Sequence, residues 1–211
     1  MRFPALLLTL VAGFSTFCVA AEAASLTRKG VTFTDELGGF VLDSVTGSGS
    51  IDDPFVVVER MIDINGGTLT ILVDPGFGNQ IGSQHLIGLS IAKVVENGTG
   101  QPWTAFELEL QSKEGVPSDY FDGLSFGQGS DSGRPFTVSG FDQLTIVDEP
   151  YDRIECDQGK IQPGSAAAFR FVITESLALP RVYLAQRPRR PVAQRAIPWR
   201  LASLKQARRS G

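Results

Sequence analysis

Hydrophobic and polar positions alternate along much of the chain, most clearly between Ser90 and Gln111. Residues 91–95 are rich in β-branched side chains, turn-forming residues follow at 97–100, and the positions from Phe106 to Gln111 alternate between apolar and charged or amide side chains. A period of two places the apolar side chains on one face of a sheet and the polar ones on the other. The stretch therefore predicts two half-buried strands joined as a hairpin.

Similar short segments recur along the rest of the chain and are separated by Gly, Asn, Asp or Pro. The dipeptide Asn65-Gly66 tolerates positive φ at both central turn positions, so it predicts a second hairpin between residues 55–64 and 69–73. No amphipathic helix is predicted before residue 190. The other predicted strands lie at 31–34, 40–42, 86–95, 106–111, 121–126, 136–138, 144–147, 169–174 and 182–184.

Closely spaced short strands without intervening helices are typical of antiparallel sandwiches and barrels. An irregular loop such as 112–133 fits the end of a sandwich better than the wall of a closed barrel. We therefore expect an all-β fold, an antiparallel two-sheet β-sandwich of immunoglobulin-like architecture, formed by residues 26–186 as one domain. Whether residues 26–84 belong to the same sandwich stays open at this point.

Residues 1–23 have the composition of a signal peptide. Arg2 gives a positive start, an apolar run extends from Ala5 to Ala20, and small residues permit cleavage after Ala21 or Ala23. An N-terminal membrane anchor is the alternative interpretation, but the apolar run is short for a membrane-spanning helix. We expect export with cleavage, and a secreted or periplasmic protein whose mature chain has no transmembrane segment.

Cleavage would remove Cys18 and leave Cys156 as the only thiol, which excludes an intramolecular disulfide. Cys156 shares a strand face with Ile154, so we expect it to be a small buried core residue. A reactive or dimer-forming thiol is the alternative.

Charge is distributed unevenly along the chain. Residues 24–179 contain 22 acidic and 9 basic residues, a net charge of −13, whereas residues 180–211 contain 9 basic and no acidic residues, a net charge of +9. An acidic body with a basic tail is predicted. We expect the tail, 187–211, to be largely disordered in isolation; the alternatives are docking on the acidic body and binding to anionic surfaces.

Few residues offer catalytic chemistry, and we expect no enzyme activity. His85 is the only histidine, which excludes a histidine-based metal cluster, and no G-x-S-x-G nucleophile motif occurs. Trp103 is expected in the core rather than on a ligand-binding surface. Asn97-Gly98-Thr99 fits a glycosylation sequon, but the turn role of Asn-Gly explains it better.

Carboxylates at predicted loop and strand ends are the remaining candidates. Asp148, Glu149 and Asp152 lie together at one such end, where oxygen ligands could hold Ca²⁺ at the rim of the sandwich. The alternative interpretation is that they are solvated turn residues. No other cofactor is expected.

The run from Val95 to Thr104, followed by Phe106-Glu107-Leu108, resembles the core of exported bacterial β-sandwich domains found among PEP-CTERM-type surface proteins. The resemblance extends over residues 85–188 and implies an exported, non-catalytic surface or matrix module, with no catalytic residue to carry over. The basic tail stands where sorted members have a Pro-Glu-Pro signal and an apolar anchor, so the resemblance does not extend to membrane sorting. Further similar segments lie at 119–127, 148–152, 161–164, 169–173 and 183–188.

We therefore expect a non-catalytic exported binding or structural module of the cell surface, periplasm or extracellular matrix, which recognises polysaccharide or protein. The alternative is a secreted hydrolase that uses loop carboxylates, which would require a carboxylate pair about 5–10 Å apart in a cleft. A third interpretation is that the basic tail binds anionic lipid, nucleic acid or polysaccharide.

Overall fold

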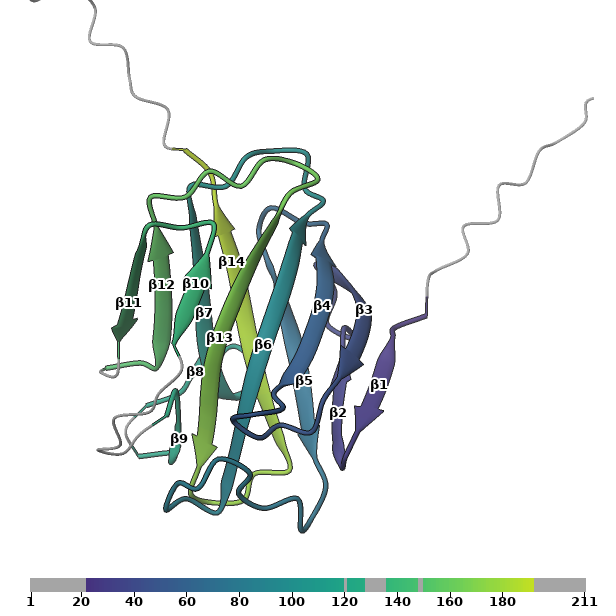
Figure 1. Cartoon of the computed structure of the whole chain (residues 1–211), viewed down its shortest axis with the longest axis vertical. Coiled ribbons are helices and arrows are strands. Elements are labelled where there is room, and N and C mark those ends of the chain that lie inside the picture. Colours follow the sequence, from purple (N-terminus) through teal and green to yellow (C-terminus); the bar gives the residue numbers. More distant parts are fainter. Residues whose placement is uncertain (1–21, 120, 128–135, 148–149, 192–211) are drawn as a thin grey trace, which may run out of the picture.

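Two β-sheets face each other in the computed structural model, which describes residues 22–119, 121–127, 136–147 and 150–191. Figure 1 shows strands β13, β6 and β4 crossing in front of β14, β7 and β5. These described residues contain no helix, and therefore none that is long and apolar enough to cross a membrane. The all-β, two-sheet prediction is confirmed, while the predicted signal peptide and the tail from residue 192 onward lie outside the described residues.

The two sheets differ in size. The eight-stranded sheet has the order β1-β2-β5-β14-β7-β12-β11, with β8 paired to β7: β1 (Ser25–Arg28), β2 (Val31–Thr34), β5 (Gly67–Val73), β14 (Arg181–Arg189), β7 (Ala105–Lys113), β12 (Arg153–Asp157), β11 (Gln143–Val147) and β8 (Val116–Pro117). The six-stranded sheet has the order β10-β13-β6-β4-β3, with β9 paired to β13: β10 (Thr137–Ser139), β13 (Ala166–Glu175), β6 (Ile87–Asn97), β4 (Phe55–Met61), β3 (Phe40–Thr46) and β9 (Leu124–Ser125).

The N-terminal strands belong to the same sandwich as the rest. β1, β2 and β5 lie in the eight-stranded sheet, and β3 and β4 lie in the six-stranded sheet. β14 continues to Arg189, so Arg187 and Arg189 lie in a central strand although we expected the basic tail to start at residue 187. Basic side chains at the end of β14 are therefore part of the fold.

Both predicted hairpins are wrong, because each turn carries the chain from one sheet to the other. β4 pairs with β3 and β6, whereas β5 pairs with β2 and β14. The backbone nitrogen of Gly66 donates to the carbonyl of Asp63 at 3.1 Å, and Gly66 has a φ of 97°. A Cβ on Gly66 would lie 2.0 Å from the carbonyl oxygen of Gln186, so only glycine allows the turn to approach β14 so closely.

A parallel strand pair follows from this crossing, so the prediction of a purely antiparallel sandwich is wrong. β5 returns in the opposite sheet, and the chain then crosses back and runs along β4 in the same direction, with Val57 in register with Lys93. Every other strand pair among the described residues is antiparallel. The six-stranded sheet is therefore mixed.

Asn97 organises the crossing from β6 to β7. Its buried side-chain amide donates to the carbonyls of Gln101 (2.7 Å) and Ile161 (3.0 Å) and accepts from the backbone nitrogen (3.0 Å) and hydroxyl (2.8 Å) of Thr99. The indole nitrogen of Trp103 donates to the same hydroxyl at 3.1 Å. Trp103 is fully buried, which confirms its core position. Because the Asn97 amide is enclosed and bonded, its structural role explains the sequon.

The core lies between the sheets and is rich in aromatic side chains. Phe106 packs on Trp103 at 5.4 Å and on Phe169 at 5.0 Å between ring centroids, and Phe126 meets Phe171 edge-to-face at 5.5 Å. Aromatic pairs in these geometries stabilise a core beyond the area that they bury. The sandwich is therefore held by contacts between side chains of both sheets.

We predict that Phe171→Ala lowers the free energy of unfolding by about 3–5 kcal/mol, because Phe171 is fully buried and its removal leaves a cavity. Leu86→Ala is the control, since Leu86 is 60% exposed, and it should change stability by less than about 0.5 kcal/mol. Urea unfolding followed by tryptophan fluorescence measures both. Equal effects would contradict the assignment of Phe171 to the core.

Candidate functional site

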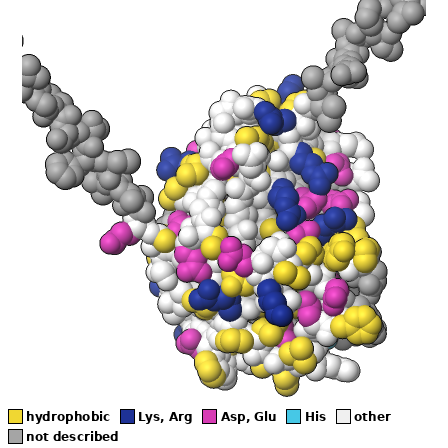
Figure 2. All heavy atoms as spheres, turned by 180° about the vertical axis from the view of Figure 1, so that it is seen from behind, with side chains coloured by type: hydrophobic (Ala, Val, Ile, Leu, Met, Phe, Trp, Pro, Cys, Tyr) yellow, Lys and Arg dark blue, Asp and Glu magenta, His cyan; other side chains and the backbone are white. Residues whose placement is uncertain are grey.

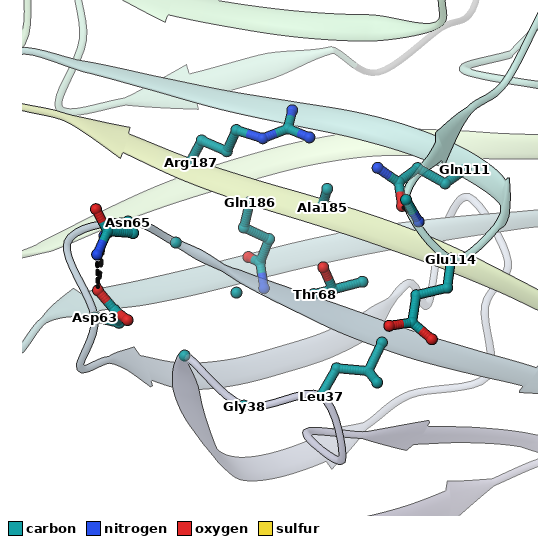
Figure 3. A pocket seen from close by; sticks show the side chains of 14 residues that line it. Leu37, Gly38, Asp63, Asn65, Thr68, Gln111, Glu114, Ala185, Gln186 and Arg187 are labelled. Carbon is teal, nitrogen blue, oxygen red and sulfur yellow. Dashed lines mark hydrogen bonds between the residues drawn. The ribbon is translucent and has the colours of Figure 1, made fainter.

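A groove of about 390 Å³ runs over the eight-stranded sheet where β5 and β14 lie side by side (Figure 3). Its walls come from the loop after β2, the crossing between β4 and β5, and the turn between β7 and β8. Segments far apart in the sequence therefore meet here. The lining residues are Leu37, Gly38, Gly39, Asp63, Asn65, Gly66, Gly67, Thr68, Gln111, Glu114, Gly115, Ala185, Gln186 and Arg187.

Glycines allow one end of the groove to form. A Cβ on Gly39 would lie 2.2 Å from the carbonyl oxygen of Gly66, and a Cβ on Gly67 would lie 2.5 Å from the carbonyl oxygen of Gly38. The carbonyl of Gly39 also accepts from the backbone nitrogens of Ile62 and Asp63, both at 3.0 Å. The loop and the crossing are thus held together through their backbones.

Polar side chains line the groove and are held by their own contacts. The carboxylate of Asp63 accepts from the backbone nitrogen (2.8 Å) and the amide (2.9 Å) of Asn65, as Figure 3 shows for the side chains. At the other end, the amide oxygen of Gln111 accepts from the backbone nitrogen of Gly115 at 2.8 Å. Figure 3 places Asp63 and Glu114 at opposite ends of the groove. The groove therefore presents fixed hydrogen-bonding groups rather than a pair of adjacent acids.

A ladder of charged side chains extends from the groove along β7 and β14. The guanidinium of Arg187 donates to Glu107 at 2.6 Å and to Glu109 at 2.8 Å, and Arg189 also donates to Glu107. Figure 2 shows acidic and basic side chains side by side on this face of the molecule. Glu107 and Glu109 alternate with core residues as predicted, but only 4% and 5% of their surface is exposed because the arginines cover them.

The ladder lowers the pKa of Glu109. Burial alone would raise the pKa of Glu109, but hydrogen bonds from Arg187 and Gln111 and the positive charges of Arg187 and Arg153 outweigh it and lower the pKa. The same contacts raise the pKa of Arg187. Because the pKa of Glu109 is lower in the folded than in the unfolded protein, this group stabilises the folded state at pH values above its ordinary pKa of 4.5. The stabilisation is lost as the pH falls through the pKa that Glu109 has in the folded state.

We predict that Arg187→Met lowers the free energy of unfolding by about 2 kcal/mol at neutral pH, because it leaves two nearly buried carboxylates without their shared cation. The difference from the unchanged protein should shrink as the pH falls below the ordinary carboxyl pKa of 4.5, because the stabilisation that comes from the lowered pKa of Glu109 is then lost. Urea unfolding at about pH 7 and about pH 3 measures it.

Arg181→Met is the matched control. Its partner is Glu36 at 3.4 Å, and both side chains are well exposed, so the loss should be less than about 0.5 kcal/mol. A loss for Arg187→Met that is equally small, or independent of pH, would contradict the ladder.

The predicted calcium ligands are only partly described. Asp148 and Glu149 lie outside the described residues. Asp152 is 1% exposed, and its carboxylate accepts from the backbone nitrogen of Phe126 and the hydroxyl of Ser118, both at 3.4 Å. Within the described ranges, no three His, Cys, Asp or Glu residues are placed to hold a metal ion. The calcium site stays a prediction.

His85 lies just before β6, half-buried, and its Nδ1 is 2.7 Å from the hydroxyl of Ser176. In the described part of the chain, no carboxylate is hydrogen-bonded to the ring of His85. A hydrolase triad requires such a group to orient the imidazole, so this pair lacks the third member.

Cys156 is 1% exposed, which confirms the predicted core position. Burial, with a smaller effect from the charge of Asp157, raises the pKa of the Cys156 thiol to about 12. Because the thiolate is the reactive form, the thiol is inert in the folded protein. Neither the groove nor the ladder uses it.

We predict that a thiol reagent such as Ellman's reagent modifies Cys156 in the native mature protein at least about 100-fold more slowly than in the urea-unfolded protein at about pH 8. The absorbance of the released thiolate measures both rates. Rapid stoichiometric modification of the folded protein would favour the reactive-thiol alternative.

Comparison with known proteins does not assign the chain to a family. No protein-family model, curated protein or solved structure matches the chain. The structure is that of an all-β, two-sheet protein with a polar groove on its larger sheet.

Proposed function

We propose that the protein is an exported, non-catalytic β-sandwich binding module, of immunoglobulin-like architecture, that acts at the cell surface, in the periplasm or in the extracellular matrix. The groove beside β5 and β14 is its ligand-binding site, and polysaccharide is the ligand that this site suits best, with protein as the other candidate. The single observation that carries the proposal is the polar, preformed lining of this groove.

The chemistry of the lining favours a sugar. Each sugar hydroxyl both donates and accepts a hydrogen bond, so a sugar site needs donors and acceptors side by side. Asn65 supplies an amide, Thr68 a hydroxyl, and Asp63 and Glu114 carboxylates. Several of these groups are held by the contacts described above, which reduces the entropy lost on binding.

The positions of the acids favour binding over hydrolysis. Glycoside hydrolysis uses two carboxyl groups about 5–10 Å apart on either side of the bond that breaks. Asp63 and Glu114 stand at opposite ends of the groove, and Asp63 is engaged by Asn65.

The basic residues beyond β14 have a separate proposed role, which is to contact anionic surfaces.

We predict that the mature protein binds immobilised bacterial polysaccharides on a glycan array, and that Thr68→Trp weakens this binding at least about tenfold, since an indole would fill the groove. Thr145→Trp is the matched control, because Thr145 is an exposed residue of β11 in the same sheet and does not line the groove. Its binding should equal that of the unchanged protein.

Two results would contradict the proposal. Equal binding by Thr68→Trp and Thr145→Trp would remove the groove as the site. Release of shortened glycans from the array would favour the hydrolase alternative.

A further inference from the structure

Three polar side chains meet inside the core, where only apolar packing is expected. Glu59 in β4, Lys93 in β6 and Gln186 in β14 each have no exposed surface. Glu59 and Lys93 come from the six-stranded sheet, and Gln186 comes from the eight-stranded sheet. Each occupies an inward position between buried apolar neighbours two residues away on its strand. The cluster therefore bridges the interior of the sandwich.

Glu59 interacts with both of the other side chains. The ammonium nitrogen of Lys93 donates to Oε2 of Glu59 and also lies 5.9 Å from the centre of the Phe40 ring. The amide of Gln186 is close enough to lower the pKa of Glu59, yet it lies outside hydrogen-bonding geometry. Lys93 and Gln186 therefore both approach the same carboxyl group, that of Glu59.

The hydrogen-bonding capacity of this cluster is not satisfied. Glu59 Oε1 and both polar atoms of the Gln186 side chain have no hydrogen-bond partner although they are buried. Buried amides are almost always bonded, so an amide with both ends unpaired requires an explanation. A plain Lys93–Glu59 ion pair leaves the Gln186 amide unexplained.

Burial also favours the uncharged forms of the pair. Burial raises the pKa of Glu59 and is only partly offset by Lys93, and it lowers the pKa of Lys93 and is only partly offset by Glu59. A neutral amine is a nucleophile, and a protonated carboxyl group is a proton donor. Both pKa shifts are in the direction of these reactive forms, and the unbonded carboxamide of Gln186 lies beside them.

We propose that Lys93 and Gln186 become joined by a side-chain amide bond that links the two sheets, formed by the protein itself with Glu59 as the proton-transfer residue. The nitrogen Nζ of Lys93 attacks Cδ of Gln186, and Glu59 donates its proton to the carboxamide. Glu59 then takes a proton from Nζ as the Cδ–Nε2 bond breaks. The products are one secondary amide and one ammonia, and no oxidant, reductant or cofactor takes part.

The product accounts for the unpaired atoms. Nε2 of Gln186 leaves as ammonia, and the remaining carbonyl oxygen accepts from the reprotonated carboxyl group of Glu59. Enclosure in the folded core supplies the proximity that makes an amide-forming step feasible without an external catalyst. The link would fasten β6 to β14, and this inference is independent of the ligand proposed for the groove.

Peptide mapping of the full chain tests the proposal directly. Trypsin cannot cleave after an acylated lysine, so the digest should contain Met61–Lys113 joined to Val182–Arg189, with a mass lower by one ammonia than the sum of the two peptides. Fragmentation should place the link at Lys93 and Gln186. Finding residues 61–93, 94–113 and 182–189 as separate unmodified peptides would overturn the proposal.

Variants assign the roles. Glu59→Gln should lose the joined peptide while both linked residues remain, and Lys93→Met should lose it because the nucleophile is gone. Lys160→Met, a change at an exposed lysine, is the matched control and should retain it. A joined peptide in folded Glu59→Gln protein would overturn the role of Glu59.

The unchanged protein gives a further test that does not depend on any variant folding. A mass deficit of one water would show an amide between Lys93 and Glu59, and would overturn Gln186 as the partner.

Discussion

Burial of one face of each sheet against the other is the constraint on which the structure depends. Strand alternation provides that face, and the chain crosses repeatedly between the sheets, including after β4 and after β6, where hairpins were expected. Each of these two crossings depends on one residue with a special role: Gly66 lets the crossing after β4 pass close to β14, and Asn97 holds the crossing after β6 through four hydrogen bonds.

The outward face of the eight-stranded sheet depends on the same arrangement. Because β14 lies between β5 and β7, Arg187 reaches both glutamates of β7, and the groove forms beside Ala185. The charged ladder is therefore a structural element rather than a solvated surface. It ties β14 to β7, and the polar groups of the adjacent groove are held by contacts of their own.

Local patterns predicted the strands well and their partners poorly. Alternation defines which face a side chain occupies, so the positions of Trp103 and Cys156 and the two faces of β7 were predictable. It does not define which strand lies alongside, and for this reason both crossings were interpreted as hairpins. The burial of Glu107 depends on Arg187, 80 residues later, and no local pattern reports such a contact. The groove likewise combines four separate segments, so neither it nor the buried cluster at Glu59 was predicted.

Strand pairing around β6 tests the account most directly, because a crossing and a hairpin place different backbones beside it. Backbone nuclear Overhauser effects in isotope-labelled protein measure it. The account predicts contacts of β6 with β13, such as Ile91 with Phe171, and a parallel series with β4, such as Lys93 with Val57. A continuous series of backbone contacts between β6 and β7 would show a hairpin and contradict the two-sheet arrangement.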